Sequence, residues 1–100
     1  MEAIIADNMD QIKSLCIVHK VKALFAFGSV VTTHFSDNSD IDLLISFVPM
    51  EPGDYADNYF EIADKFEEVF NRPVDLVTDK SLKNPYFIDS VNKSKSILFG

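Results

Sequence analysis

Cysteine is nearly missing from this chain and long apolar runs are absent, and each absence excludes a class of protein. The single cysteine, Cys16, rules out an intrachain disulfide framework. No apolar run approaches the ~20 residues that a membrane-spanning helix needs. The start, Met1-Glu2-Ala3, lacks the basic residues that open a signal peptide. We therefore expect a cytoplasmic protein with no membrane segment.

Positive charge is scarce as well. Lysine and arginine together number 9 against 16 aspartates and glutamates, Arg72 is the sole arginine, and the formal net charge is −7. Such a chain repels a phosphate backbone, so we expect no direct binding to nucleic acid. An acidic surface fits a basic protein partner, but it also serves solubility alone. The composition leaves these two interpretations open.

Apolar residues are plentiful, which predicts a folded core. They make up 47% of the chain and include nine phenylalanines, enough for one α/β domain over residues 1–100. The apolar spacing predicts helices over 3–19, 55–71 and 85–93, strands over 21–27, 41–48 and 74–78, and a short strand or packed tail over 96–99. A short helical turn from Gly28 to His34 and a loop over 35–39 connect the first two strands.

Three aspartates stand in or beside the predicted strands. Asp40 and Asp42 are two residues apart, so their side chains share one face, with their Cα atoms about 7 Å apart. Asp75 lies inside a later strand and can supply a third carboxylate. Carboxylates gathered in this way repel one another, and a hard cation such as Mg²⁺ offsets the repulsion. The alternative is that Asp40 only caps the strand and Asp42 is solvated.

A Gly-Ser pair ends the first predicted strand. Gly28 has no Cβ, so a ligand can approach its backbone closely, and Ser29 adds a hydroxyl beside the free N–H groups of a following turn. This combination is typical of phosphate binding, although a plain strand-to-helix turn would read the same way. Lys80 and Lys83 follow the strand of Asp75 and either help to neutralise a triphosphate or are ordinary surface lysines.

Taken together, these segments resemble one known family. The stretches Leu-Phe-Ala-Phe-Gly-Ser (24–29), Asn-Ser-Asp-Ile-Asp-Leu-Leu-Ile (38–45) and Val-Asp-Leu-Val-Thr (74–78) are similar to the signature of the minimal nucleotidyltransferases, in the DNA polymerase beta-like superfamily. The resemblance implies a mixed β-sheet with helices packed on it. It also implies transfer of a nucleoside monophosphate to a hydroxyl, with pyrophosphate leaving.

The resemblance assigns roles by position. Gly28 and Ser29 would hold the triphosphate of ATP, and Asp40 and Asp42 would bind two Mg²⁺ ions. Asp75 would complete the metal site and orient or deprotonate the attacking hydroxyl. In the family a segment Arg-x-Arg-Gly usually follows the Gly-Ser pair, whereas this chain has Val-Val-Thr-Thr at positions 30–33.

The small size of the chain leaves no room for an acceptor-binding domain. Minimal nucleotidyltransferases of this kind are similar to antitoxins that are paired with HEPN-domain toxins and transfer AMP to a toxin tyrosine. We therefore expect a HEPN-type toxin as partner, in a homo- or hetero-oligomer. Because the basic segment is missing, an antitoxin that neutralises its partner by binding alone stays open. A third alternative, which we favour less, is a transferase that acts on a small molecule or RNA within a larger assembly.

Overall fold

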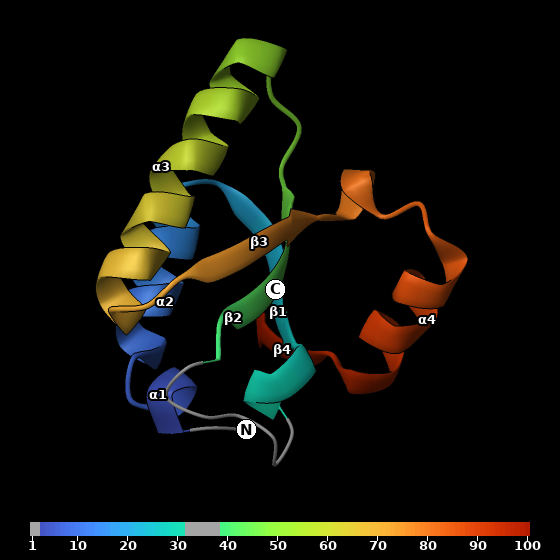
Figure 1. The fold of residues 1–100 in the computed structure, drawn as a ribbon. Coiled ribbons are helices and arrows are strands. Elements are labelled where there is room, and N and C mark those ends of the chain that lie inside the picture. Colours follow the sequence, from blue (N-terminus) through green and yellow to red (C-terminus); the bar gives the residue numbers. More distant parts are fainter. Residues whose placement is uncertain (1–2, 32–38) are drawn as a thin grey trace.

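A four-stranded sheet runs through the middle of the fold (Figure 1). The computed structural model describes residues 3–31 and 39–100. The strand order is β3-β2-β1-β4, and the strands are β1 (Val21–Phe27), β2 (Ile41–Phe47), β3 (Val74–Thr78) and β4 (Ser96–Phe99). β1 is antiparallel to β2 and β4, and β2 is parallel to β3. The predicted mixed sheet is confirmed, and the last segment is a strand rather than a tail.

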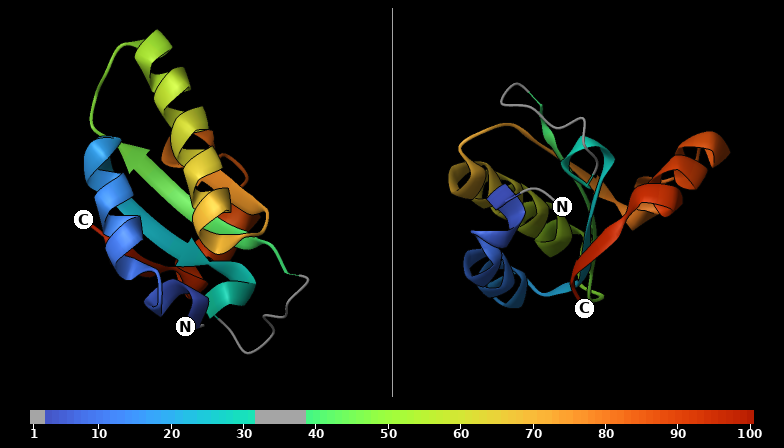
Figure 2. Two further views of the ribbon diagram at one scale, coloured as in Figure 1. Left: turned by 90° about the vertical axis from the view of Figure 1, so that its left-hand side faces the viewer. Right: turned by 90° about the horizontal axis from the view of Figure 1, so that it is seen from below.

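One face of the sheet carries most of the core. Three helices cover it, and these are α1 (Ala3–Ala6), α2 (Met9–Val18) and α3 (Pro52–Phe70) (Figure 2). α3 presents Ile62, Phe66 and Phe70 to the sheet at its predicted apolar spacing. Phe66 is fully buried, and burial of a side chain of that size contributes about 1.5–3 kcal/mol.

The opposite face of the sheet is only partly covered. α4 (Pro85–Ser94) packs there through Val91, which forms a small buried cluster with Phe27 and Leu44. Ile97 on the edge strand β4 remains 56% exposed. The helix predicted over 85–93 is confirmed, and the Asn84 side chain caps it by accepting hydrogen bonds from the N–H groups of the first turn.

The helix expected over 3–19 is wrong as a single element, because it breaks at residues 7 and 8. The Asn8 side chain donates to the Ile4 carbonyl at 2.8 Å, and α2 begins at the next residue. Asparagine competes in this way with backbone hydrogen bonds inside a helix. The apolar residues on the two sides of the break still face the core, since Ile5, Ile12 and Cys16 are all fully buried.

Other boundaries differ by a few residues. α3 begins at Pro52 rather than at 55, because proline suits the first helical position. A 3-10 turn, η1 (Gly28–Val31), follows β1 as predicted, and its expected continuation to His34 lies outside the described residues. Within residues 3–31 and 39–100, we find no helix with the length and apolar character to cross a membrane.

Candidate active site

Two of the three predicted aspartates are neighbours on the partly covered face of the sheet. Asp42 on β2 and Asp75 on β3 are direct partners in the parallel register. The next pair along, Leu43 and Leu76, points into the core, so the two carboxylates share the opposite face. Adjacent strands are about 4.8 Å apart, and the pairing therefore places two acidic side chains side by side.

The electrostatics of this pair favour a cation. Burial, followed by the negative charges of Asp75 and Asp40, raises the pKa of Asp42 from an ordinary 3.8 to about 6. The ionised form is therefore disfavoured where it stands. Carboxylate oxygens are the donors that Mg²⁺ prefers, so these two residues fit a hard divalent ion chemically.

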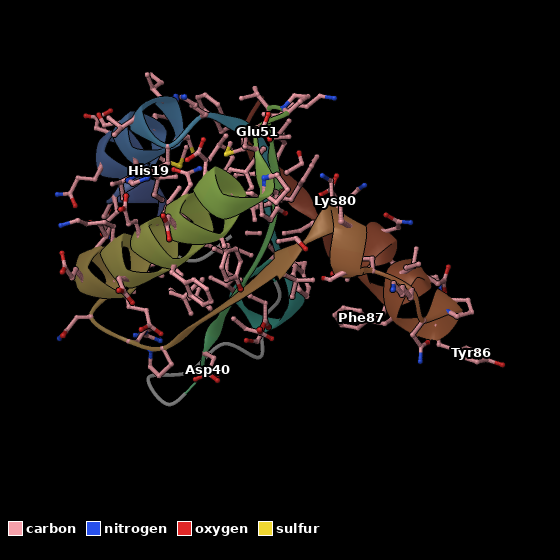
Figure 3. All side chains as sticks on the ribbon, turned by 90° about the horizontal axis from the view of Figure 1, so that it is seen from above. His19, Asp40, Glu51, Lys80, Tyr86 and Phe87 are labelled. Atoms are coloured by element: carbon pink, nitrogen blue, oxygen red, sulfur yellow. The ribbon has the colours of Figure 1, made fainter. Side chains whose placement is uncertain are left out.

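Asp40 stands apart from the other two acids. It precedes β2 and is exposed, and Figure 3 shows it at the outer edge of the molecule. Among the residues that the structure describes, no three Asp, Glu, His or Cys side chains are gathered closely enough to hold a metal ion. The sheet therefore aligns Asp42 with Asp75, and Asp40, placed before the first ladder residue, does not join them in a three-carboxylate cage.

Gly28 packs directly on Asp42. Its φ is +71°, and a Cβ added there would lie 2.5 Å from Oδ2 of Asp42. The close approach follows from the register, because Phe27 is the antiparallel partner of Asp42. Only glycine fits this position without strain. The predicted Gly28-Ser29 turn and the predicted acidic pair are thus parts of one surface.

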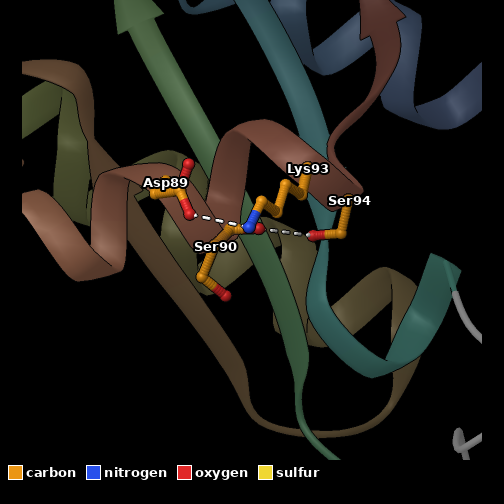
Figure 4. A network of polar contacts seen from close by, with 4 residues as sticks. All are labelled: Asp89, Ser90, Lys93 and Ser94. Atoms are coloured by element: carbon orange, nitrogen blue, oxygen red, sulfur yellow. Dashed lines mark hydrogen bonds and ion pairs between the residues drawn. The ribbon is translucent and has the colours of Figure 1, made fainter.

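Ser94, at the end of α4, is a neighbour of this turn that sequence reasoning missed. The Gly28 N–H donates to Ser94 Oγ at 3.4 Å, across 66 residues of sequence. The Ser94 hydroxyl in turn donates to the Ser90 carbonyl at 3.3 Å (Figure 4). No local pattern marks such a serine, since the contact depends on how α4 packs.

The residue after Ser29 belongs to the core. Val30 is fully buried in the main apolar cluster. A cationic side chain at this position would have to be buried, which is costly without a partner. The packing of η1 therefore gives a physical reason for valine at a position where the family that this chain resembles has arginine.

Arg72 organises the approach to β2, a role the sequence did not suggest. Its Nη1 donates to the Ser39 carbonyl at 3.2 Å. Next to this contact, the Ile41 N–H donates to the Pro73 carbonyl at 3.1 Å. The junction between α3 and β3 thereby holds the start of β2, next to Asp40.

Tyr59 supports β3 from the other face of the sheet. Its hydroxyl donates to the Leu76 carbonyl at 2.6 Å. Burial, followed by the charges of Asp75 and Tyr55, raises the pKa of Tyr59.

Other candidates lie away from the acids. Lys80 sits over the Tyr55 ring, 5.1 Å from its centroid, at the far end of β3 from Asp75 (Figure 3). That position does not support the suggested contact with a triphosphate beside Asp75. Lys83 is exposed. His19 is buried, with its ring nitrogen 3.0 Å from the Asn58 side-chain oxygen.

Cys16 and the larger cavities are also remote from this surface. Burial raises the pKa of the Cys16 thiol to about 12, so the thiol is an inert part of the core. A cavity of about 380 Å³ lies between α2 and α3, lined by residues such as Ser14, Leu15 and Val69. The acidic pair itself stands on a more open part of the surface, with Asp75 exposed.

Comparison with known proteins gives this surface a context. The family model described as "Polymerase beta, Nucleotidyltransferase" matches residues 10–100. A relative from Methanocaldococcus jannaschii, named "Putative protein adenylyltransferase MJ0128", is 36% identical over 75 residues, which cover 75% of this chain and 74% of the relative. The solved "Structure of putative minimal nucleotidyltransferase" is similar with a TM-score of 0.74 at 25% identity, over 92% of this chain and 90% of that one.

Two toxin–antitoxin structures share the fold. One, described as a toxin-antitoxin with AMP-PNP, has a TM-score of 0.72 at 24% identity, over 93% of this chain and 73% of that one. The other contains a tri-AMPylated HEPN toxin of Shewanella oneidensis in complex with MNT antitoxin, with a TM-score of 0.65 at 22% identity, over 95% and 71%. The family match over residues 10–100 and the relative that is 36% identical over 75% of the chain place this protein in the polymerase beta-type nucleotidyltransferase family.

Proposed function

We propose that this protein transfers AMP from ATP to a hydroxyl of a partner protein, a tyrosine of a HEPN-type toxin, and thereby acts as its antitoxin. The observation that carries the proposal is the in-register pair Asp42 and Asp75 beside the Gly28 turn. Support for the acceptor comes from the relative named as a protein adenylyltransferase. The choice of partner is supported by the solved complex that includes a chain of similar fold and contains an AMPylated HEPN toxin.

Each site residue has a proposed task. Gly28 and Ser29 would bind the triphosphate, and Asp40, Asp42 and Asp75 would hold two Mg²⁺ ions. Bound metal would neutralise the triphosphate and help to align the attacking and leaving oxygens. The raised pKa of Asp42 supports this assignment, because an adjacent cation favours the ionised carboxylate.

The proposed reaction is a displacement at the α-phosphorus. A bond forms between the acceptor oxygen and the α-phosphorus, and the bond from that phosphorus to the bridging oxygen breaks. Pyrophosphate leaves with the bonding electron pair. Asp75, which is exposed and within reach of an incoming side chain, accepts the proton of the acceptor hydroxyl.

The charge of the chain favours a macromolecular acceptor. The formal net charge of −7 favours a partner with a basic surface.

The direct test is a transfer assay. The protein is incubated with Mg²⁺, labelled ATP and the protein encoded by the neighbouring gene, and the intact mass of that partner is measured. We expect added AMP on a tyrosine, and a loss of roughly a hundredfold or more in Asp42→Asn or Asp75→Asn, because the carboxylates position the metal. Asp64→Asn, at an exposed position on α3, is the matched control and should transfer normally. A wild-type protein that leaves every partner hydroxyl unmodified would refute transfer.

Neutralisation by binding alone is the second candidate function. The observation in its favour is Val30, which puts a buried apolar side chain where the resembling family has a basic segment. A toxicity assay separates the two functions. If the double variant Asp42→Asn/Asp75→Asn neutralises the toxin as well as the wild type does, contact is sufficient. If toxicity returns while the complex still forms, transfer is the function.

A further inference from the structure

Among the described residues, no cation has so far been placed at the proposed triphosphate site. The segment after Ser29 carries none, and Lys80 lies at the wrong end of β3. Triphosphate binding beside two carboxylates needs positive charge from the protein as well as from metal. A segment that is distant in sequence and close in the fold can supply this charge.

The sheet register leads to Lys95. Asp75, Asp42 and Phe27 are successive partners across β3, β2 and β1. On the other side of β1, Ala26 pairs with Ser96 in antiparallel register. Lys95 is the residue before Ser96, and the register extended by one residue places it opposite Phe27. The row that begins with the two acids therefore continues across β1 to a lysine.

The Lys95 side chain lies on the same face as the acids. Its Nζ is 4.9 Å from the centroid of the Phe25 ring. Phe25 and Phe27 are two residues apart on β1, so their side chains share that face. Asp42 and Lys95 are two strand spacings apart along the row, about 10 Å between backbones. Phe27 lies between them in this row and is 5% exposed beneath α4, so a bound triphosphate and the lysine side chain would meet at the end of β1, beside Gly28.

The residue before Lys95 already touches the predicted phosphate-binding turn. The Ser94 hydroxyl accepts the hydrogen bond from the Gly28 N–H. The α4–β4 junction, residues 94 and 95, therefore faces Gly28 with a hydroxyl and carries a cation next to it. Lysine is a common binder of phosphate as a mobile point charge.

We propose that Lys95 binds the triphosphate of the nucleotide and supplies the positive charge that the segment after Ser29 lacks, an inference that rests on the proposed nucleotidyl transfer. Lys93 is not an equivalent candidate. Its Nζ is paired with Asp89 at 2.9 Å along the outside of α4 (Figure 4). The two lysines lie two residues apart and carry the same charge, which makes Lys93 the matched control.

The test measures binding of AMP-PNP in the presence of Mg²⁺ by titration calorimetry. We expect Lys95→Met to weaken affinity roughly tenfold or more, the size of one lost charge-assisted hydrogen bond. Lys95→Arg should restore most of it, and Lys93→Met should bind like the wild type. Lys95→Met should also reduce the salt dependence of binding, because one ion pair is gone. Thermal unfolding of each variant checks that the fold is retained.

The outcomes separate this inference from the function on which it rests. If the wild type binds AMP-PNP and Lys95→Met binds it equally well, Lys95 has no part in the site. Equal losses in Lys93→Met and Lys95→Met would reduce the effect to net charge and overturn the assignment. If the wild type itself fails to bind AMP-PNP with Mg²⁺, the proposed transfer fails, and the role of Lys95 fails with it.

Discussion

Gly28 is the residue at which the two halves of the candidate site meet. It has a left-handed φ of +71°, and the space where a Cβ would be is occupied by the Asp42 carboxylate. Gly28→Ala should cost about 1–3 kcal/mol of stability, from the left-handed backbone and from displacement of Asp42. The expected drop in Tm is about 4–8 °C per kcal/mol for a domain of this size, measured by circular dichroism.

Gly53 is a matched control for that substitution. It lies in the first turn of α3 with no atom within 4 Å of an added Cβ. Gly53→Ala should leave the free energy of unfolding unchanged or raise it by up to about 1 kcal/mol, because alanine reduces the entropy of the unfolded chain. If Gly28→Ala and Gly53→Ala lost the same stability, the loss would come from adding a methyl group to any glycine and not from the contact with Asp42.

Asp42 should make stability depend on pH when metal is absent. Its pKa is raised to about 6 in the folded protein, so the folded state keeps a proton that the unfolded state releases at lower pH. Stability therefore falls as pH rises from about 4 through 6. Asp42→Asn should be more stable than the wild type at pH 7.5, on the order of 1 kcal/mol after allowance for solvent screening.

Thermal unfolding in EDTA, compared at pH 4 and pH 7.5, measures this difference. The advantage of Asp42→Asn should disappear at pH 4, and Asp64→Asn, at an exposed position on α3, should show no such pattern. Added Mg²⁺ should raise the Tm of the wild type but not that of Asp42→Asn. If Asp42→Asn were less stable than the wild type at pH 7.5, the prediction that ionised Asp42 destabilises the fold would be wrong.

At the scale of elements, local patterns carried most of the prediction. Apolar periodicity located the strands, and the helix predicted from residue 85 begins at Pro85. The break at Asn8 was missed because it depends on one side chain that hydrogen-bonds to the backbone within a stripe that stays apolar. The early start of α3 was missed because a proline and a glycine resemble a loop when they only open a helix.

The candidate site divides in the same way between local and distant signals. Gly28, Ser29 and the three aspartates stand out because glycine and aspartate are unusual beside apolar strands. Ser94, Arg72 and Lys95 could not be found like this, since each acquires its position from packing or register across the chain. Local sequence patterns identify the acidic and glycine residues of the candidate site, whereas the residues around them are identified only once the topology is known.

The whole molecule divides its sheet between two tasks. The face under α1, α2 and α3 holds the main core, and the other face holds Asp42, Asp75 and the small cluster that anchors α4 (Figure 2). Substitutions on the two faces should therefore have different effects on the candidate site even where they cost equal stability. A core change should act on folding alone, and a change beneath α4 should also disturb the turn at Gly28.

Val91 and Phe66 test this division. Val91 is 1% exposed on the α4 side, three residues before Ser94, and Phe66 is fully buried on the core side. Val91→Ala and Phe66→Leu should each cost roughly 1–2 kcal/mol from lost apolar contacts. At temperatures where both remain folded, calorimetry should find weaker AMP-PNP binding only in Val91→Ala, because loosened packing of α4 displaces the Ser94 hydroxyl from the Gly28 N–H. Equal weakening in Phe66→Leu would show that the two faces are coupled and that the sheet does not separate stability from the site.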